Sequence, residues 1–76
     1  MKELVGFIAK SLVDHPEEVK TAQIEENDNI TVELTVSQDD LGKIIGKQGR
    51  TARAIRSILA AAAGKENKRS RLDILE

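Results

Sequence analysis

The chain has 76 residues, of which 39% are hydrophobic and 33% are charged, and its formal net charge is −1. This balance predicts one small globular domain over residues 1–76, because disordered chains are poorer in apolar residues. The absence of cysteine excludes disulfides and thiolate metal ligands. Since the sequence shows neither a bilayer-length apolar run nor a signal-peptide pattern, we expect a cytoplasmic protein with no membrane contact.

The charge is distributed unevenly along the chain. Residues 1–40 carry three basic and ten acidic side chains, whereas residues 41–76 carry nine basic and three acidic ones, so the net charges are −7 and +6. Such a division allows one face to bind a polyanion while the whole chain stays close to neutral. Two solvated surfaces of opposite sign would give the same composition, so charge alone leaves both interpretations open.

The first element predicted is an amphipathic helix over residues 3–13. Its apolar residues recur every four positions, at Leu4, Ile8 and Leu12. That spacing is typical of one buried helix face. Pro16 disfavours a helical conformation in the residue before it, so the helix should end near Asp14. We interpret Phe7, the only aromatic residue, as part of the core.

Two strands are predicted next. The weaker one covers residues 19–26, and the clearer one is marked by hydrophobic residues at every second position, at Ile30, Val32, Leu34 and Val36. Strict alternation is typical of a half-buried strand. Asn27, Asp28 and Asn29 between the strands favour a turn, so the sequence predicts an antiparallel hairpin.

A short helix is predicted after Ser37, whose side chain should cap the free N–H groups of the first turn. Asp39 and Asp40 then place negative charge where the helix dipole favours it. The apolar side of this helix consists of Leu41, Ile44 and Ile45.

A longer helix should run from about residue 50 to 63 and end at Gly64. Its predicted inward residues are Ile55, Ile58, Leu59 and Ala62, and its polar side carries Arg50, Arg53 and Arg56. A basic loop and a last strand over residues 71–75 complete the chain. The order predicts an α+β fold in which three helices cover one face of a three-stranded sheet.

Between the two later helices, Gly46 and Gly49 bracket Lys47 and Gln48. Glycine lets backbone N–H groups approach a ligand closely, and the following helix points its positive end at the same place. From residue 43 to 56 there are five basic residues and no acidic one. This turn is therefore predicted to bind an anion, although the two glycines could also merely end one helix and begin the next.

The run Ile44-Ile45-Gly46-Lys47-Gln48-Gly49-Arg50 resembles the Ile-Gly-x-x-Gly signature of the KH domain, which binds single-stranded nucleic acids. The additional helix and strand at the start resemble the type II, bacterial arrangement, and the resemblance spans essentially the whole chain. It implies a non-catalytic RNA-binding protein that clamps about four nucleotides, with a role in RNA-level regulation or as an RNA chaperone.

The resemblance also implies which residues contact RNA. Around the loop these are Lys43, Ile44, Ile45, Gly46, Lys47, Gln48, Gly49, Arg50, Thr51 and Arg53. A variable loop at about residues 64–70 borders the groove in type II domains and would add Lys65, Lys68 and Arg69. We expect Leu41, Ile44, Ile45 and Ile55 to serve as groove floor or core, and residues 30–36 to form the far wall.

The sequence argues against an enzyme. A P-loop needs four residues between its glycines and a Ser or Thr after the lysine. Here three residues separate Gly42 from Gly46, and Gln48 follows Lys47. One histidine and no cysteine leave no nucleophile–base pair or zinc site, so we expect no catalytic residue, metal or cofactor.

A second hypothesis is that the chain is mainly a protein-interaction module, with RNA binding secondary. The small side chains of Ala60–Ala63 would let another backbone approach the last helix. The resemblance implies a homodimer, or a heteromer with a larger KH-containing protein, and the two hypotheses are compatible. Salt discriminates between them, because phosphate binding weakens steeply with salt and apolar contact does not.

Overall fold

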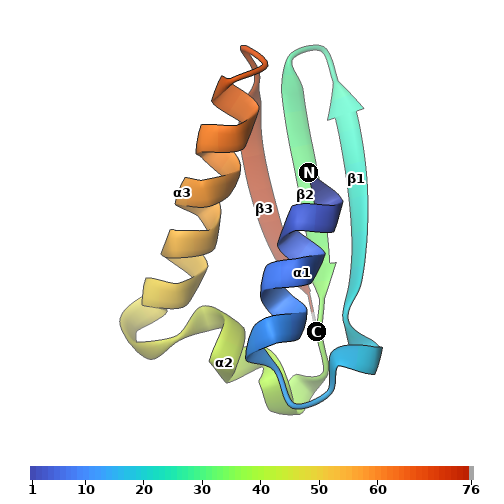
Figure 1. Ribbon diagram of the computed structural model, residues 1–76, viewed down its shortest axis with the longest axis vertical. Coiled ribbons are helices and arrows are strands. Elements are labelled where there is room, and N and C mark those ends of the chain that lie inside the picture. The colour runs from blue at the N-terminus through green and yellow to red at the C-terminus, as the bar shows by residue number, and fades with distance from the viewer. Residues whose placement is uncertain (76) are drawn as a thin grey trace.

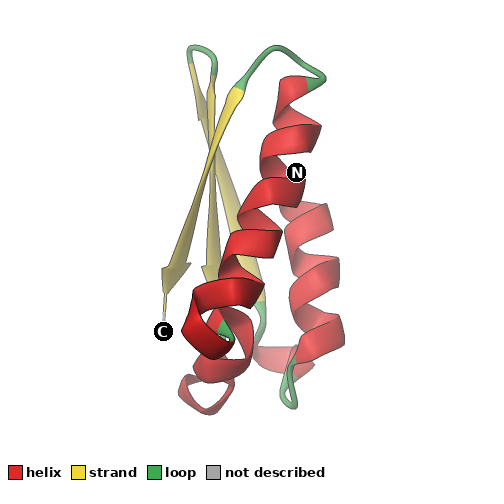
Figure 2. Cartoon of the chain, turned by 90° about the vertical axis from the view of Figure 1, so that its left-hand side faces the viewer, coloured by secondary structure: helices red, strands yellow, loops and turns green. Residues whose placement is uncertain are grey.

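A computed structural model describes residues 1–75, and within them the fold is α+β, as predicted. Three helices cover one face of a three-stranded sheet and leave the other face open (Figures 1 and 2). The elements are α1 (Lys2–Leu12), β1 (Lys20–Glu26), β2 (Asn29–Thr35), α2 (Leu41–Ile45), α3 (Arg50–Gly64) and β3 (Arg69–Leu75). Short 3₁₀ turns occur at Pro16–Glu18, Gln38–Asp40 and Lys47–Gly49. No helix in this part of the chain is long and apolar enough to cross a membrane.

The strand order in the sheet is β1-β2-β3. The first two strands are antiparallel, with Lys20 opposite Thr35, which confirms the predicted hairpin. The last two are parallel, with Val32 beside Leu72. Parallel neighbours need a crossover connection, and α2 and α3 provide it. The glycine turn therefore lies in the middle of the crossover.

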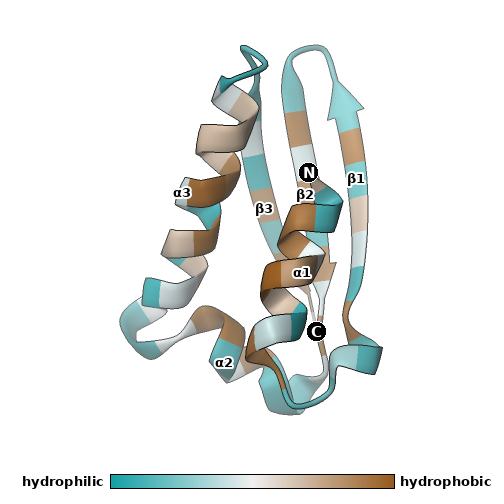
Figure 3. Cartoon of the chain, in the orientation of Figure 1, coloured by the Kyte–Doolittle hydropathy of each residue, from teal (hydrophilic) through white to brown (hydrophobic). Residues whose placement is uncertain are grey.

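The core lies between the sheet and the helices. Hydrophobic and more polar residues alternate along β2 (Figure 3), and its apolar side chains Ile30, Val32 and Leu34 are buried. The helices contribute Val5, Ala9, Ile44, Ile55, Leu59 and Ala63, and β3 contributes Leu72. Burying one Ile or Leu side chain stabilises the fold by about 1.5–3 kcal/mol, so this cluster holds the crossover onto the sheet.

Two side chains that the sequence assigned to the core are exposed instead. Phe7 is 72% exposed because it lies on the side of α1 opposite Val5 and Ala9. Ile58 is 45% exposed because it lies about 100° around α3 from the stripe that faces the sheet. The buried positions of α3 are Ala52, Ile55, Leu59 and Ala63, and the predicted Ala62 is only half-buried.

The end of α3 also differs in detail from the prediction. The helix ends at Gly64, as expected, but the left-handed residue that completes the turn is Asn67, with φ 58°. The N–H of Arg69 then donates to the carbonyl of Asp28 at 2.8 Å. This bond joins the last turn to the β1–β2 hairpin, so β3 begins two residues earlier than predicted.

Candidate nucleic-acid interface

The Gly46–Gly49 turn connects α2 to α3 through left-handed backbone. The φ angles are +76° at Gly46, +58° at Gln48 and +73° at Gly49. A Cβ on Gly46 would lie 2.2 Å from Oγ1 of Thr51, whereas a Cβ on Gly49 would meet nothing within 4 Å. Gly46 is therefore required for both space and conformation, and Gly49 for conformation alone.

The turn uses part of its own hydrogen-bonding capacity. The N–H of Gly49 donates to the carbonyl of Gly46 at 3.1 Å, and the N–H of Arg50 donates to the carbonyl of Lys47. Within residues 1–75, the structure gives no partner to the N–H groups of Lys47 and Gln48, and both side chains are exposed. Two neighbouring residues thus present free donors and a cation at one place.

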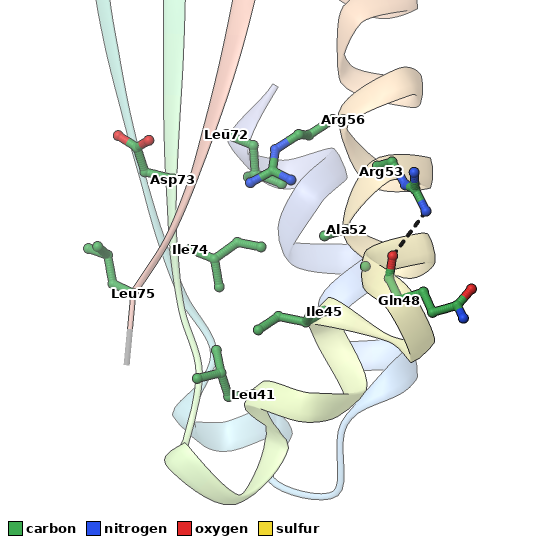
Figure 4. A pocket seen from close by; sticks show the side chains of 11 residues that line it. Leu41, Ile45, Gln48, Ala52, Arg53, Arg56, Leu72, Asp73, Ile74 and Leu75 are labelled. Carbon is green, nitrogen blue, oxygen red and sulfur yellow. Dashed lines mark hydrogen bonds between the residues drawn. The ribbon is translucent and has the colours of Figure 1, made fainter.

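Two of the three arginines of α3 contact Gln48, and the third does not. Arg50 donates from Nη2 to Oε1 of Gln48 at 3.2 Å, and Arg53 donates from Nη2 to the carbonyl of Gln48 at 3.0 Å. Arg53 therefore stabilises the left-handed conformation of Gln48 in the turn. Arg56 instead extends across the space between α3 and β3, toward Leu72 (Figure 4). The spacing of three in the sequence could not distinguish these orientations.

A groove of about 740 Å³ lies beside the turn. It is lined by Leu41, Ile45, Gln48, Gly49, Ala52, Arg53, Arg56, Leu72, Asp73, Ile74 and Leu75. Leu41 and Ile45 from α2 face Leu72 and Ile74 from β3 across it (Figure 4). The groove thus has an apolar interior, with basic side chains and the glycine turn along one margin.

One expectation about this groove was wrong, and the structure decides one alternative that the sequence left open. Its far wall is β3, not residues 30–36, because β2 is the central strand and β3 is the edge strand beside α3. Ile44 and Ile55 are core residues, only 0% and 2% exposed, and they support the groove from below. Leu41 and Ile45 do line it, as predicted.

A buried carboxylate fixes the start of α2. Asp40 is completely buried; its Oδ1 accepts the N–H of Asp14 at 3.1 Å, and its Oδ2 accepts the N–H of His15 at 2.9 Å. The hydroxyl of Ser37 donates to the same Oδ2 at 3.1 Å. The prediction that this side chain caps the helix backbone was therefore wrong. Burial by itself would raise the pKa of Asp40, but these hydrogen bonds hold that pKa below its ordinary value.

Lys43, which was predicted to contact RNA, is held toward the end of α1. Its Nζ lies 2.8 Å from Oδ2 of Asp14 and 3.8 Å from Oδ1 of Asp40. The hydrogen bond to Asp14 and the charge of that carboxylate raise the pKa of Lys43. Lys43 therefore points toward Asp14 and Asp40 at the start of α2, and not toward the glycine turn.

The structure does not bring the predicted variable-loop residues to the glycine turn. They lie at the other end of α3, and a helix of 15 residues is about 22 Å long (Figure 1). There Lys68 pairs with Glu25, which raises the pKa of Lys68, while Lys65 and Arg69 are exposed.

One group of side chains in residues 1–75 is close enough to share a metal ion. His15, Glu17 and Glu18 have ligand atoms within 4.8 Å of one another, on a largely exposed 3₁₀ turn away from the groove. Nδ1 of His15 already lies 3.6 Å from Oε2 of Glu17. This arrangement is a contact between neighbouring surface side chains.

The arrangement as a whole is that of a type II KH domain. Two helices joined by a Gly-x-x-Gly turn form the crossover of a mixed three-stranded sheet, beside an apolar groove. The family model described as KhpA/KhpB, KH domain, matches residues 2–74. The chain therefore belongs to the KhpA/KhpB family of KH domains.

Individual relatives match over nearly their full length. The RNA-binding protein KhpA of Halalkalibacterium halodurans is 51% identical over 76 residues, which is all of both chains. That of Clostridium perfringens is 55% identical over 75 residues, covering 99% of this chain and 100% of the relative. That of Borreliella burgdorferi is 55% identical over 74 residues, covering 97% and 90%. No solved structure gave a match.

Proposed function

We propose that this chain is a non-catalytic protein that binds single-stranded RNA. The Gly46–Gly49 turn would clamp the sugar–phosphate backbone while about four nucleotides lie along the groove. One observation carries the proposal: Gly46 packs so closely on Thr51 that no side chain fits, directly beside exposed Lys47 and the apolar groove. The curated relatives, which are named RNA-binding proteins, support the same function.

The chemistry of the contact divides between the turn and the groove. Phosphate would meet the ammonium of Lys47, the N–H groups of Lys47 and Gln48, and the positive end of α3. Bases would lie on aliphatic side chains such as Leu41 and Ile45. The only aromatic residue, Phe7, does not line the groove, so stacking on an aromatic ring is not part of this mechanism. We therefore expect modest affinity.

The test is fluorescence anisotropy of a labelled single-stranded RNA with the parent and the Lys47→Asp/Gln48→Asp double variant. The variant should lose binding because two negative charges replace the phosphate contacts. Lys10→Asp/Ser11→Asp makes the same charge change on the exposed face of α1 and should retain most of the affinity. Circular dichroism checks that each variant is folded. Equal binding by parent and loop variant, or none by either, would refute the proposal.

Salt provides a second measurement on the parent protein. The logarithm of the affinity should fall linearly with the logarithm of the salt concentration, with a slope of about −0.7 for each phosphate contact. Lys47→Gln should make that slope shallower by about one contact. An affinity that does not respond to salt would contradict the phosphate clamp.

We also propose that the chain pairs with a second KH domain through a surface remote from the turn. A depression of about 480 Å³ between α1 and α3 is lined by the apolar residues Met1, Leu4, Ile58, Ala61 and Ala62, together with Lys65 and Glu66. Leu4 is 38% exposed and Ile58 is 45% exposed. The grouping of these exposed apolar side chains in one depression supports an interaction there. The occupant would be another copy of this chain or a larger KhpB-like protein, and pairing would increase RNA affinity by effective concentration.

This pairing is testable by sedimentation of the free protein. Ile58→Glu should produce monomers because it places a charge in the apolar surface, whereas Ser57→Glu adds the same charge at an exposed neighbouring position and should not. A monomeric parent at micromolar concentration would exclude self-pairing. Cellular roles in RNA-level regulation or as an RNA chaperone would follow from RNA binding and pairing together.

A further inference from the structure

Arg56 differs from the other basic residues around the groove in where its side chain lies. Arg50 and Arg53 donate to Gln48, and Lys43 pairs with Asp14. The guanidinium of Arg56 instead extends between α3 and β3 and lines both the main groove and its continuation along β3 (Figure 4). Within residues 1–75, the structure gives it no hydrogen bond or ion pair.

The surroundings of this guanidinium suit a base better than a phosphate. Ala52, Leu72 and Ile74 line the same groove as Arg56 and offer apolar contact to a flat ring. The one carboxylate that lines the groove, Asp73, accepts from Nε of Arg71 at 3.0 Å and points away from Arg56 (Figure 4). Arg56 is therefore a cation with no partner in residues 1–75 that extends over apolar side chains of the groove, whereas Lys47 and the N–H groups proposed to hold phosphate belong to the turn at the groove's margin.

The hydrogen-bonding chemistry of arginine restricts which bases can use this position. A guanidinium has donors only, and it presents two of them in parallel. Guanine matches that pair with adjacent O6 and N7 acceptors, and cytosine matches it with adjacent N3 and O2. Adenine places a donor beside each ring acceptor on these edges, and uracil has a donor between its two carbonyls. Neither can accept both bonds.

We propose that Arg56 selects the base in the groove and favours guanine or cytosine, the two bases with adjacent acceptors, over adenine and uracil. This inference rests on the proposed function, because it requires RNA to lie in the groove. It assigns Arg56 a role distinct from that of Lys47, which holds the backbone without regard to sequence.

The experiment measures anisotropy with labelled octanucleotides of uridine, adenosine, cytidine and alternating uridine–guanosine, in which the guanines are kept apart. The parent should bind the cytidine or the guanosine-containing RNA at least about fivefold more tightly than the uridine and adenosine RNAs. Replacing guanine by 7-deazaguanine, which lacks N7, shows whether guanine is read on that edge. A loss of affinity there, or a preference for cytidine alone, identifies which acceptor pair is used, and either result supports the proposal.

The variants separate base selection from charge. Arg56→Gln and Arg56→Lys should both bring the ratio between favoured and disfavoured RNAs close to one, because lysine keeps the charge but lacks the paired donors. Lys47→Gln should weaken binding to all four RNAs in proportion and leave the ratio unchanged. Lys10→Gln, which removes one exposed charge from α1, should change neither the affinity for RNA nor the ratio between favoured and disfavoured RNAs.

Three results would overturn the proposal. Equal affinity of the parent for all four RNAs would exclude selection, and an unchanged ratio in Arg56→Lys would show that charge alone matters. A uniform loss of affinity in Arg56→Gln with a shallower salt slope would make Arg56 a phosphate contact. In each of these cases the proposed function would still hold if the Lys47→Asp/Gln48→Asp variant lost RNA binding. A parent that binds no RNA would refute both.

Discussion

The two ends of α2 are built in opposite ways. At its start the carboxylate of Asp40 is completely buried and accepts three hydrogen bonds from the chain. At its other end, Lys47 and Gln48 expose their side chains and have N–H groups with no partner in residues 1–75. A helix of five residues is unstable by itself, so its position must come from tertiary contacts. One end is fixed so that the other can hold its shape with its donors free.

Gly46→Ala should have the largest effect on this contrast, because it deforms the free end. The new Cβ would meet Oγ1 of Thr51 at 2.2 Å and its backbone N at 2.8 Å, in a conformation that side chains rarely adopt. We expect a loss of roughly 3 kcal/mol of unfolding free energy and a more than tenfold loss of RNA affinity. Chemical denaturation and anisotropy measure the two quantities.

Two neighbouring glycines provide matched controls for that substitution. Gly49→Ala meets no atoms but keeps the positive φ, so it should cost about 1 kcal/mol. Gly42→Ala meets no atoms inside α2 and should be neutral, or stabilising by up to about 1 kcal/mol. A Gly46→Ala variant as stable as Gly42→Ala would mean that the packing on Thr51 does not constrain the turn.

Asp40→Asn should have the next largest effect, because it weakens the fixed end. The amide keeps one oxygen but turns an NH₂ group toward an N–H donor, either that of Asp14 or that of His15. We expect the midpoint of thermal unfolding to fall by about 5 °C or more. RNA affinity should also fall although no groove residue has changed.

The matched control is Asp39→Asn, which removes the same charge from an exposed neighbour. Its unfolding midpoint should stay close to that of the parent. If the two variants unfold together, the buried hydrogen bonds of Asp40 do not anchor the helix.

Lowering the pH should weaken the start of α2 more gradually, because it protonates Asp40. The folded pKa of Asp40 lies below the ordinary value of 3.8, so its stabilisation is fully present above about pH 4 and is lost as the pH falls through the lower folded value. The parent should therefore lose stability faster than Asp40→Asn below pH 4. Unfolding midpoints from pH 7 to 2 test this, and parallel curves for the two proteins would contradict it.

Lys43→Gln should have the smallest effect. It tests whether Lys43 belongs to the fixed start of α2 or to the glycine turn. The ammonium is committed to Asp14, so RNA affinity should fall less than threefold, and less than in Lys47→Gln. Anisotropy at two salt concentrations measures both variants. A larger loss of affinity in Lys43→Gln would mean that Lys43 contacts RNA and does not only support the start of α2.

Local signals predicted most of the fold. The alternation at Ile30, Val32 and Leu34 identified the central strand, and the turn before it identified the hairpin. The glycine pair and the isoleucine before it predicted the turn between α2 and α3. These features were readable because each depends on neighbours within a few residues.

The incorrect predictions concern contacts between distant residues. Whether Phe7 or Ile58 is buried depends on how far the contact stripe of each helix extends, which periodicity does not specify. The role of Asp40 depends on backbone groups about 25 residues earlier in the chain. The far wall of the groove depends on strand order. For the same reason, the sequence could not show that Arg56 extends across the groove toward β3 while Arg53 bonds to the turn.

The wall of the groove is also a free edge of the sheet. β3 pairs only with β2 among the described strands, and an unpaired edge is a template for adding a strand from another molecule. Charged residues at alternate positions, Arg69, Arg71 and Asp73, oppose such edge-to-edge aggregation. A ligand lying along β3 would shield the same edge. If a ligand does bind along β3, strand addition from another molecule would compete most strongly with the native state when the groove is empty.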